Sequence, residues 1–333
     1  MTWLFWRQYR ASTAITGVLI GLFAVLVVIS GLAMARQFHA DFGACLAANT
    51  CRFPSDNAQL GSGLIGAVIE FSLAVPALLG MFLGAPAVAR EVETGTAHFA
   101  WTQAVTRRQW LTAKAGWLLL AAVAWGGAVG ALVTWWAGPR NTVAANQFSP
   151  GTFDVQGIMP AAYSLFAMAL GIAAGTLIRR VLPALGVTLG VFFGVRLMIM
   201  GWVRQHYMTP ITSVYNVAQG FIVPPKGAAW ILGQGVRGPN GPLVMPGGPV
   251  QIVGNGFPVA DVPAACHKYV TQGGSQISSR LYPCLTSHGY SQYLTYQPAA
   301  RYWPFQFIEA GIFVVLAAAL IALTFAVINR RDA

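Results

Sequence analysis

Long apolar segments separated by short polar ones dominate the pattern of this chain. Six of them are long enough to cross a bilayer as helices, because a helix rises about 1.5 Å per residue and the hydrocarbon core is about 30 Å thick. Backbone groups in lipid must find hydrogen-bond partners within their own segment, so these spans are predicted to be α-helical. The expected fold class is an all-α polytopic membrane protein with six transmembrane helices, at residues 15–35, 63–87, 113–136, 158–178, 182–202 and 305–328.

Composition agrees with a chain whose main solvent is lipid. Of the 333 residues, 56% are apolar and only 9% are charged, whereas globular proteins carry about 25% charged residues. The net charge of +11 would also suit a nucleic-acid binder. The basic residues, however, are scattered singly and in pairs among apolar runs rather than gathered into a patch. No nucleic acid is therefore expected as a partner.

The N-terminus, residues 1–10, combines aromatic and cationic side chains. This mixture predicts an interfacial helix that lies along the membrane surface, and the alternative is a frayed tail. The apolar run that follows has about 20 residues, longer than the 7–15 of a signal peptide, so it is predicted to be a retained span. The apolar residues of the helix are Trp3, Leu4, Phe5 and Trp6, and the cationic ones are Arg7 and Arg10.

Basic residues near the span ends predict the orientation, since cytoplasmic segments carry an excess of Lys and Arg. The long fifth loop is left out of this comparison because long loops translocate largely regardless of charge. Both termini are predicted to be cytoplasmic, in the plasma membrane. With that orientation the short outer loops carry only Arg36, Arg52 and Arg140, while the inner segments carry Arg7, Arg10, Arg90, Arg107, Arg108, Lys114, Arg179, Arg180, Arg330 and Arg331.

The four cysteines all fall in loops that this orientation places outside the cell, where disulfides persist. Four cysteines allow three pairings. Local pairing is favoured because each bond then closes a loop within one segment, joining Cys45 to Cys51 and Cys266 to Cys284. A zinc site at Cys266, Cys284 and their neighbours His267 and His288 is the alternative, but its spacing matches no standard ligand pattern, so no metal is expected.

The fifth loop divides the chain into three parts. Residues 1–202 hold the first five spans, residues 203–304 form an extracellular domain rich in turn signals, and residues 305–333 hold the sixth span and a cytoplasmic tail. The start of the outer domain, residues 211–232, is too interrupted by proline and glycine to span. It is short enough to dip into the outer leaflet as a re-entrant element.

Several spans carry glycines four residues apart, a spacing that lets helix backbones approach closely in lipid. Packing within one subunit and a seam between two copies both explain them. The glycines are Gly17 and Gly21, Gly80 and Gly84, Gly126 and Gly130, Gly171 and Gly175, and Gly186, Gly190 and Gly194.

Three ionisable residues lie inside the spans. Counted along their helices, Arg196 is about 9 Å, Glu70 about 11 Å and Glu309 about 6 Å below the outer surface. A charge in the membrane usually faces protein or water and finds a partner. We therefore expect Arg196 to pair with Glu70 or with Glu309, either as a structural ion pair or as part of a substrate path.

The inner segment between the second and third spans, residues 89–114, mixes charges with tryptophan and reads AREVETGTAHFAWTQAVTRRQWLTAK. It suits a short amphipathic helix across the cytoplasmic face, with Glu91, Glu93, Arg107 and Arg108 presented to a soluble partner. The alternative is an ordinary solvated loop held inside by its arginines.

This segment resembles the stretch between the second and third helices of type-2 ABC export permeases, the membrane subunits of ATP-binding cassette exporters. The resemblance rests on the pattern Arg90-Glu91-x-Glu93-x-Gly95-Thr96, followed by Thr106-Arg107 and Lys114. The six spans and the enlarged last outer loop also fit the family. The amino-acid sequence is similar to that of an actinobacterial branch of these permeases. Many relatives have proline where Val105 stands, and the outer domain is longer than in most.

The resemblance implies a permease subunit of an ATP-driven exporter that moves a hydrophobic or amphipathic substrate out of the cell. Its partners would be a separate ATPase subunit, which holds ATP and magnesium, and a second permease copy, identical or a close paralogue. Spans two and five would line the path, with Phe71, Phe192 and Phe193 as substrate contacts. The segment that docks on the ATPase would be a coupling helix with Arg90, Glu91, Glu93, Gly95, Thr96, Thr106, Arg107 and Arg108.

The chain is not expected to be an enzyme by itself. A phosphate-binding loop needs lysine directly after glycine, and the three lysines, Lys114, Lys226 and Lys268, follow Ala, Pro and His. The alternative function is an ATP-independent membrane protein: a sensor whose outer domain binds a ligand, or a secondary transporter coupled through Glu70. A membrane enzyme ranks third, since the spans hold no cluster of histidines or carboxylates.

Overall fold

The computed structural model describes residues 2–47, 62–94, 106–144, 147–148, 150–216, 228–238, 241–242, 263–269 and 280–330. These residues separate into two compact units. The helical unit comprises Met1–Ala144, Ser149–Arg204 and Trp303–Ala333, and the mixed unit comprises Ala145–Phe148 and Gln205–Tyr302. The divisions after Arg204 and before Trp303 lie within two residues of the boundaries expected at 202 and 305.

Six helices of the described chain are long and apolar enough to cross a membrane, which confirms the expected number of spans. They cover Gly17–Ala40, Gly66–Glu91, Arg108–Gly138, Met159–Ile178, Val181–His206 and Ala299–Arg330. The elements that form them, with one short helix between the third and fourth spans, are α1 (Thr2–Ala47), α2 (Ser62–Leu79), η2 (Gly80–Gly84), α3 (Ala85–Glu93), α5 (Arg107–Ala144), α6 (Pro150–Val155), α7 (Met159–Ile178), α8 (Val181–Met198), η3 (Ile199–Val203), η4 (Arg204–His206) and α10 (Tyr302–Arg330).

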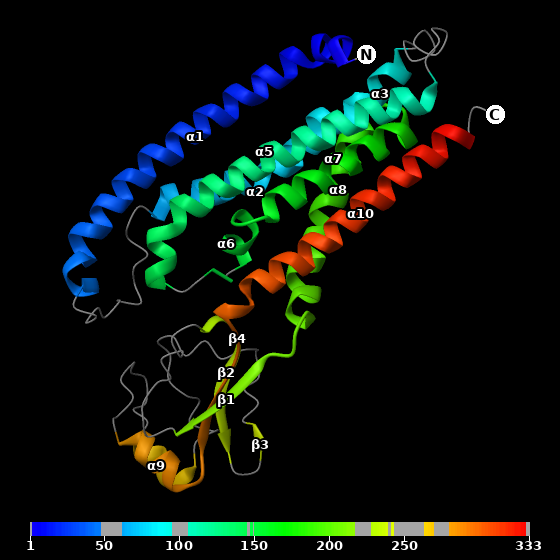
Figure 1. The fold of residues 1–333 in the computed structure, drawn as a ribbon. Coiled ribbons are helices and arrows are strands. Elements are labelled where there is room, and N and C mark those ends of the chain that lie inside the picture. Colours follow the sequence, from blue (N-terminus) through cyan, green and yellow to red (C-terminus); the bar gives the residue numbers. More distant parts are fainter. Residues whose placement is uncertain are drawn as a thin grey trace. The chain divides into compact units, whose positions relative to one another are not determined.

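Helix α1 is continuous from Thr2 into the first span (Figure 1). No glycine or proline occurs before Gly17, so nothing in the local sequence interrupts the helix. Residues 2–10 are therefore helical but are not a separate element. Their position at the membrane surface stays a prediction.

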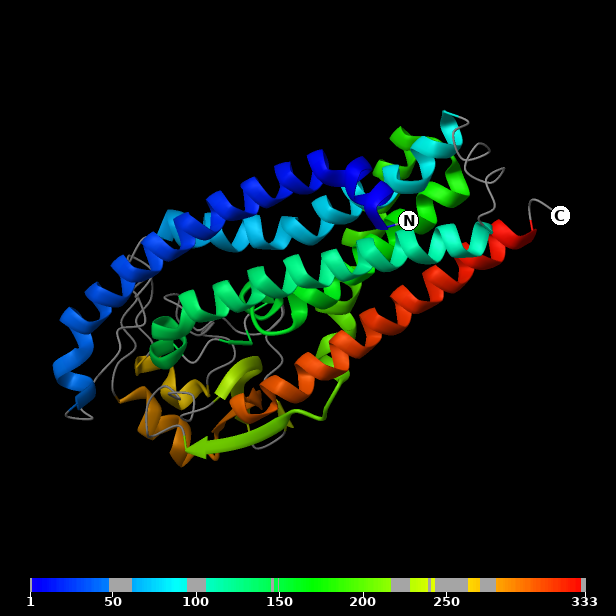
Figure 2. The same ribbon diagram turned by 45° about the horizontal axis from the view of Figure 1, so that its top comes forward.

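Helix α7 forms the centre of the helical unit, and most of its residues are buried. It lies beside α5 in both ribbon views (Figures 1 and 2) and contacts α2, η2, α3 and α8 as well. Glycines allow these contacts. A Cβ on Gly171 would lie 2.2 Å from the carbonyl oxygen of Gly80, and one on Gly175 would lie 2.4 Å from that of Ala85. These glycines pack helices of one chain together.

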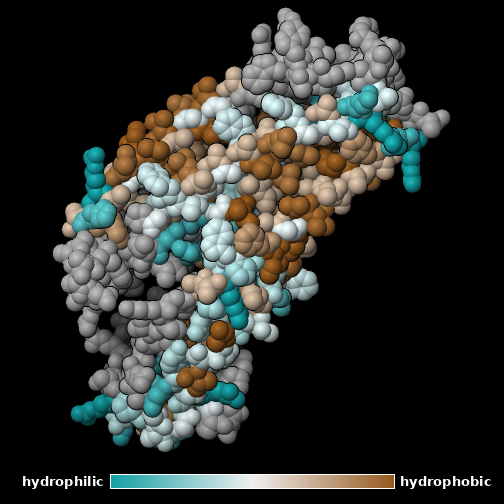
Figure 3. All heavy atoms as spheres, viewed as in Figure 1, coloured by the Kyte–Doolittle hydropathy of each residue, from teal (hydrophilic) through white to brown (hydrophobic). Residues whose placement is uncertain are grey.

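The glycines of α8 differ from those of α7. Gly186, Gly190 and Gly194 are exposed, and a Cβ on any of them would meet nothing within 4 Å. Exposed apolar side chains are also common on the other long helices, such as Leu22 and Ile29 of α1 and Val315 of α10. Figure 3 shows apolar side chains gathered over the long helices on one face. An apolar surface of this kind suits contact with lipid or with other apolar helices.

Two spans contain a five-residue π-helical turn. In the second span, η2 follows Pro76, which removes one backbone donor from α2. In the fifth span, η3 separates α8 from Arg204. Such turns insert a residue into the helix and often occur at functional sites.

The mixed unit contains an antiparallel sheet with the strand order β1-β4-β2-β3. Central strand β4 pairs Thr295 with Thr212 of β1 and with Gly233 of β2. The strands are β1 (Ile211–Asn216), β2 (Ala228–Gly238), β3 (Gly241–Pro242) and β4 (Ser291–Pro298), and the short helices are η7 (Ala264–Tyr269), α9 (Leu281–Ser287) and η8 (Ala299–Arg301). The all-α fold class thus holds for the helical unit and is wrong for the mixed unit.

The sheet also corrects the expectation of a re-entrant element over residues 211–232. The described parts of this stretch, 211–216 and 228–232, are strands paired with β4, and residues 217–227 lie outside the described residues. The sequence of β1, ITSVYN, is rich in β-branched and aromatic residues, which favour strands.

Candidate functional site: buried charges and the inner end of the spans

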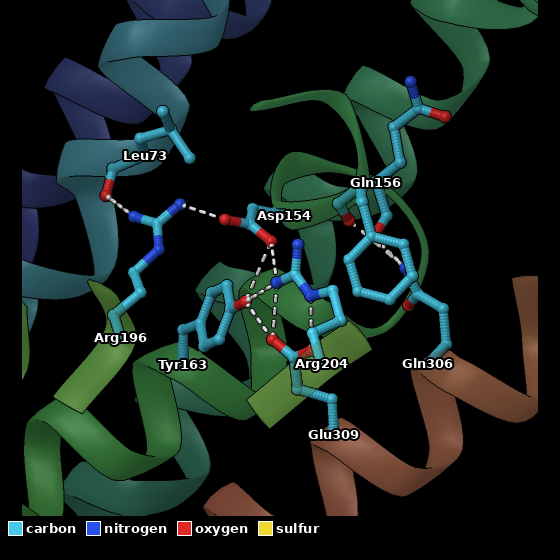
Figure 4. Close-up of polar contacts among 9 residues, drawn as sticks. Leu73, Asp154, Gln156, Tyr163, Arg196, Arg204, Gln306 and Glu309 are labelled. Atoms are coloured by element: carbon cyan, nitrogen blue, oxygen red, sulfur yellow. Dashed lines mark hydrogen bonds and ion pairs between the residues drawn. The ribbon is translucent and has the colours of Figure 1, made fainter. Parts of the chain in front are cut away.

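Two arginines and two carboxylates meet inside the helical unit (Figure 4). We call Asp154, Tyr163, Arg196, Arg204 and Glu309 the buried charge cluster. They come from α6, α7, α8, η4 and α10, and none is more than 6% exposed. Two positive and two negative side chains balance, which lowers the large cost of placing charges in an apolar interior.

Arg204 makes the most contacts in the cluster. Its Nε and Nη2 donate to the two oxygens of Glu309, both at 2.7 Å, and Nη2 also pairs with Asp154. This two-pronged contact uses the planar fork of the guanidinium, a geometry that lysine cannot reproduce. Arg204 therefore ties the C-terminal end of the fifth span to α10 and α6.

Asp154 bridges the two arginines. Its Oδ2 accepts a hydrogen bond from Arg196 Nη2 at 2.8 Å, while its other oxygen faces Arg204. Arg196 Nη1 also donates to the backbone carbonyl of Leu73 in α2, at 3.3 Å. Through Arg196 the cluster thus reaches the second span.

Tyr163 adds a hydroxyl and an aromatic wall. Its oxygen lies 2.7 Å from Glu309 Oε1 and 3.1 Å from Asp154 Oδ1, so it can donate its proton to either carboxylate. The Arg196 guanidinium lies 5.0 Å from the centre of the Tyr163 ring, within the range of a cation–π contact. The Phe313 ring packs against the Tyr163 ring in a T-shaped arrangement, with the ring centres 4.8 Å apart.

The turn after α6 places Asp154 in the interior. Gly157 adopts φ +62°, a backbone conformation that glycine tolerates and other residues rarely adopt. Gln306 of α10 holds the turn: its side-chain oxygen accepts from the Ile158 N–H at 3.0 Å, and its side-chain nitrogen donates to the carbonyls of Phe153 (3.2 Å) and Gln156 (3.3 Å). The backbone groups of a tight buried turn are satisfied in this way.

The expected partners of Arg196 were wrong. Arg196 pairs with Asp154, whereas Glu309 lies in the same cluster but is bound by Arg204. Glu70 is exposed on α2 and takes part in none of the ion pairs among the described residues. Counting depth along the spans failed because α6 folds back between the third and fourth spans and carries a carboxylate inward.

Sequence reasoning missed Asp154, Tyr163, Arg204 and Gln306. One signal was available, since Asp154 is one of only nine acidic residues and lies four positions before the fourth span expected at 158. Arg204 lies two residues beyond the fifth span expected to end at 202, and it was assigned to the outer segment.

The three phenylalanines expected to contact substrate do not share one surface. Phe192 is fully buried beside Tyr163 and Phe166. Phe71 and Phe193 are 39% and 37% exposed, and Phe71 stacks on Phe23 of α1. Only these two remain at the surface of the helical unit, where a substrate or another chain could meet them.

The carboxylates expected to face a soluble partner are bound within the chain. Glu91 pairs with the buried Lys114 of α5 at 2.6 Å, and Glu93 Oε2 accepts a hydrogen bond from the Val181 N–H at 3.0 Å. Both residues lie at the end of α3, in the inner segment and shortly before its residues 95–105. Glu91 therefore links α3 to α5, and Glu93 links α3 to α8 while it remains exposed. That both carboxylates also face a soluble partner stays a prediction.

The start of α5, at the end of the inner segment, is held by side-chain hydrogen bonds. Thr106 and Gln109 form a reciprocal cap at the start of α5, each side chain bonding the other's backbone N–H at 3.3 Å. Arg108 Nε donates to Asn329 Oδ1 of α10 at 3.2 Å.

Arg90 is exposed. Gly95, Thr96 and the Arg107 side chain lie outside the described residues.

In the mixed unit Cys266 and Cys284 form a disulfide, with Cα atoms 5.9 Å apart. His288 Nδ1 lies 3.9 Å from Cys266 Sγ, so three of the four residues weighed as zinc ligands lie close together, with both sulfurs used by the disulfide. The expected pair of Cys45 and Cys51 cannot be followed, since Cys51 and the Cys45 side chain lie outside the described residues.

Comparison with protein families identifies a match. The family model described as "ABC-2 membrane transporter related" matches residues 17–204. This stretch holds the first four spans, all but the last two residues of the fifth, the inner segment and four of the five residues of the buried charge cluster. No curated protein and no solved structure matches the chain.

Proposed function

Because the chain belongs to the ABC-2 membrane transporter related family, we propose that it is the permease subunit of an ATP-driven exporter and works with a separate ATPase subunit. The observation that carries this proposal is the family match over residues 17–204, which contains the inner segment expected to meet the ATPase. The ends of α3 and α5 that flank this segment are fixed to α8 and α10 by hydrogen bonds.

The inner contacts support a role in passing movement to the spans. Glu91 and Lys114 hold α3 to α5, and Glu93 holds α3 to α8. Movement of this segment would therefore act on α3 and α5 and, through these contacts, on α8 and α10. ATP bound by the partner would shift the spans between inward-open and outward-open states to the extent that it favours one of them.

The substrate we propose is hydrophobic or amphipathic, because the described surface of the spans is apolar. Phe71 and Phe193 are its candidate contacts on spans two and five. A second permease copy completes the path, and the exposed apolar surface of α8 is compatible with such a contact. ATP and magnesium are held by the partner subunit.

The proposed orientation has both termini in the cytoplasm and the mixed unit outside the cell. The disulfide between Cys266 and Cys284 supports this side for the mixed unit, since disulfides persist in oxidising compartments. A phosphatase reporter fused after residue 331, active only outside the cytoplasm, should be inactive, whereas one inserted between residues 243 and 250 should be active.

Co-purification tests the proposed function. The chain, expressed with the ATPase encoded by its neighbouring gene, should form a stable complex in lipid nanodiscs and raise the ATP turnover of that ATPase. The matched control replaces the phosphate-loop lysine of the ATPase with alanine, which should keep the complex and abolish turnover. If the chain is stably folded and neither binds nor stimulates the ATPase, the ATP-independent alternative takes its place.

A further inference from the structure

A carboxylate at the end of α3 joins the inner segment to the start of the fifth span. Glu93, the last residue of α3, accepts a hydrogen bond from the backbone N–H of Val181, the first residue of α8, although the two are 88 positions apart in the sequence. Residues 95–105 begin directly after this contact. Glu93 before residues 95–105 and Arg108 after them are therefore two points at which the flanking helices connect to another span.

The N-terminus of α8 has no cap of its own. Arg180, which precedes the helix, is extended (φ −128°, ψ 130°) and its side chain makes no capping bond. The first N–H groups of a helix lack intrahelical partners and carry a partial positive charge. Pro183 has no N–H to satisfy, and Glu93 provides an acceptor with negative charge for Val181.

Close apolar packing accompanies the hydrogen bond. Ala85 of α3, Ala174 of α7 and Ala184 of α8 form a small buried cluster, each no more than 4% exposed. Gly175 allows the backbones of α3 and α7 to meet beside it. Small side chains leave little room for the helices to slide independently, so α3, which begins at Ala85, and the start of α8 should move as one block.

The other end of the same span carries the two arginines of the buried charge cluster. Arg196 lies within α8, and Arg204 follows η3 at its end. From Val181 to Arg204 the element extends roughly 35 Å at the rise of a helix. It therefore connects the inner segment to charged contacts with α2, α6 and α10.

We propose that Glu93 is the positioning residue that transmits movement of the inner segment to α8 and, through Arg196 and Arg204, to the buried charge cluster. This inference rests on the proposed function, because an ATPase bound at the inner segment supplies the movement. It assigns Glu93 a contact inside the membrane subunit rather than a contact with the ATPase.

The test removes each half of the hydrogen bond separately. Glu93→Ala removes the acceptor. Val181→Pro removes the donor at a helix position where proline is favoured, and the extended Arg180 before it suits a residue preceding proline. Glu93→Gln keeps an acceptor oxygen and should retain most of the coupling. Thr94→Ala, at the next residue, removes a hydroxyl bonded within α3 and is the matched control.

Coupling is measured in the complex with the ATPase in nanodiscs, with spin labels at the exposed positions Leu197 of α8 and Val315 of α10. Magnesium and ATP should shift the distance distribution of the wild type. Glu93→Ala and Val181→Pro should each lower the equilibrium constant of that shift roughly fivefold, the factor that loss of one helix cap represents. The double variant should be no worse than either single one, and ATP turnover should continue.

Three results decide between the claims. If the wild-type distances respond to ATP and both single variants respond as strongly as the wild type, the role of Glu93 is wrong and the proposed function stands. If Glu93→Ala alone loses the response, Glu93 acts on another group and the inference is also wrong. If the wild-type chain does not bind the ATPase at all, the proposed function and this inference fall together.

Discussion

Single residues of the buried charge cluster matter because each charge is bound by more than one partner. Asp154 contacts both arginines, and Arg204 contacts both carboxylates. Removing one member of a buried ion pair leaves the other uncompensated, which usually costs more than removing both. The cluster therefore makes specific predictions about pairs of substitutions.

Arg196→Ala should destabilise the chain by about 3–5 kcal/mol, because it leaves part of the Asp154 carboxylate without its partner. Adding Asp154→Asn should restore much of this loss, since Arg204 and Glu309 still balance each other. Thermal unfolding in detergent, followed by tryptophan fluorescence, measures both effects. Glu70→Gln is the control and should change little. Equal destabilisation of the single and double variants would contradict the pairing.

Gly157→Ala should also destabilise the chain, for a reason that lies in the backbone. A left-handed conformation costs a residue with a side chain about 1–2 kcal/mol, and the added Cβ would lie 2.7 Å from Gln306 Oε1. Gly311→Ala in α10, where an added Cβ meets nothing within 4 Å, is the matched control in the same thermal assay. A Gly157→Ala variant as stable as the control would show that the turn is not held as described.

At the scale of elements, the sequence predicted the helices better than their contacts. The length of an apolar run and its lack of charged residues define a membrane span. All six expected spans were found. The cluster was not found, because it depends on α6, which is six residues long and lies between two spans. The sheet was missed because its strands are separated by long stretches rich in glycine and proline.

The two kinds of glycine predict opposite responses to alanine. Gly171→Ala should weaken folding of the helical unit, because a Cβ there would lie 2.2 Å from the Gly80 carbonyl oxygen. Gly190→Ala should leave folding unchanged or slightly improved, as alanine is the better helix former. Yield of monodisperse protein and the melting temperature compare the two. Equal behaviour would contradict the packing of α7 against η2.

The disulfide of the mixed unit gives a prediction that needs no mutation. Alkylation without reductant, followed by mass spectrometry of the folded protein, should find no free thiol at Cys266 or Cys284. The same experiment tests the pair expected between Cys45 and Cys51. Labelling of Cys266 or Cys284 in the folded chain would be incompatible with the bond.

At the scale of the whole molecule, we propose that the chain transmits movement of the inner segment across the membrane. The inner segment is anchored through α3 and α5, the fifth span runs from Val181, which Glu93 contacts, to the arginines of the cluster, and α10 is bound near both of its ends. The sequence pattern identified the inner segment but not the contacts of Glu91 with Lys114 and of Glu93 with Val181, since a motif does not reveal which neighbour a carboxylate meets.

Reversing Glu91 to arginine would place a second positive charge beside the buried Lys114, so the variant would disturb folding as well as docking. Replacing residues 95–105 with a glycine–serine linker of equal length avoids this problem. The anchors at Glu91, Glu93, Thr106 and Arg108 all remain.

The most direct test of the central claim is therefore ATP turnover of the partner ATPase in nanodiscs with this linker variant. The account predicts unchanged membrane insertion and melting temperature, with loss of both ATPase binding and stimulation. A control replaces the outer loop residues 53–60 with the same kind of linker and should retain both. Wild-type binding and stimulation by the 95–105 variant would contradict the claim that this segment receives the work of ATP.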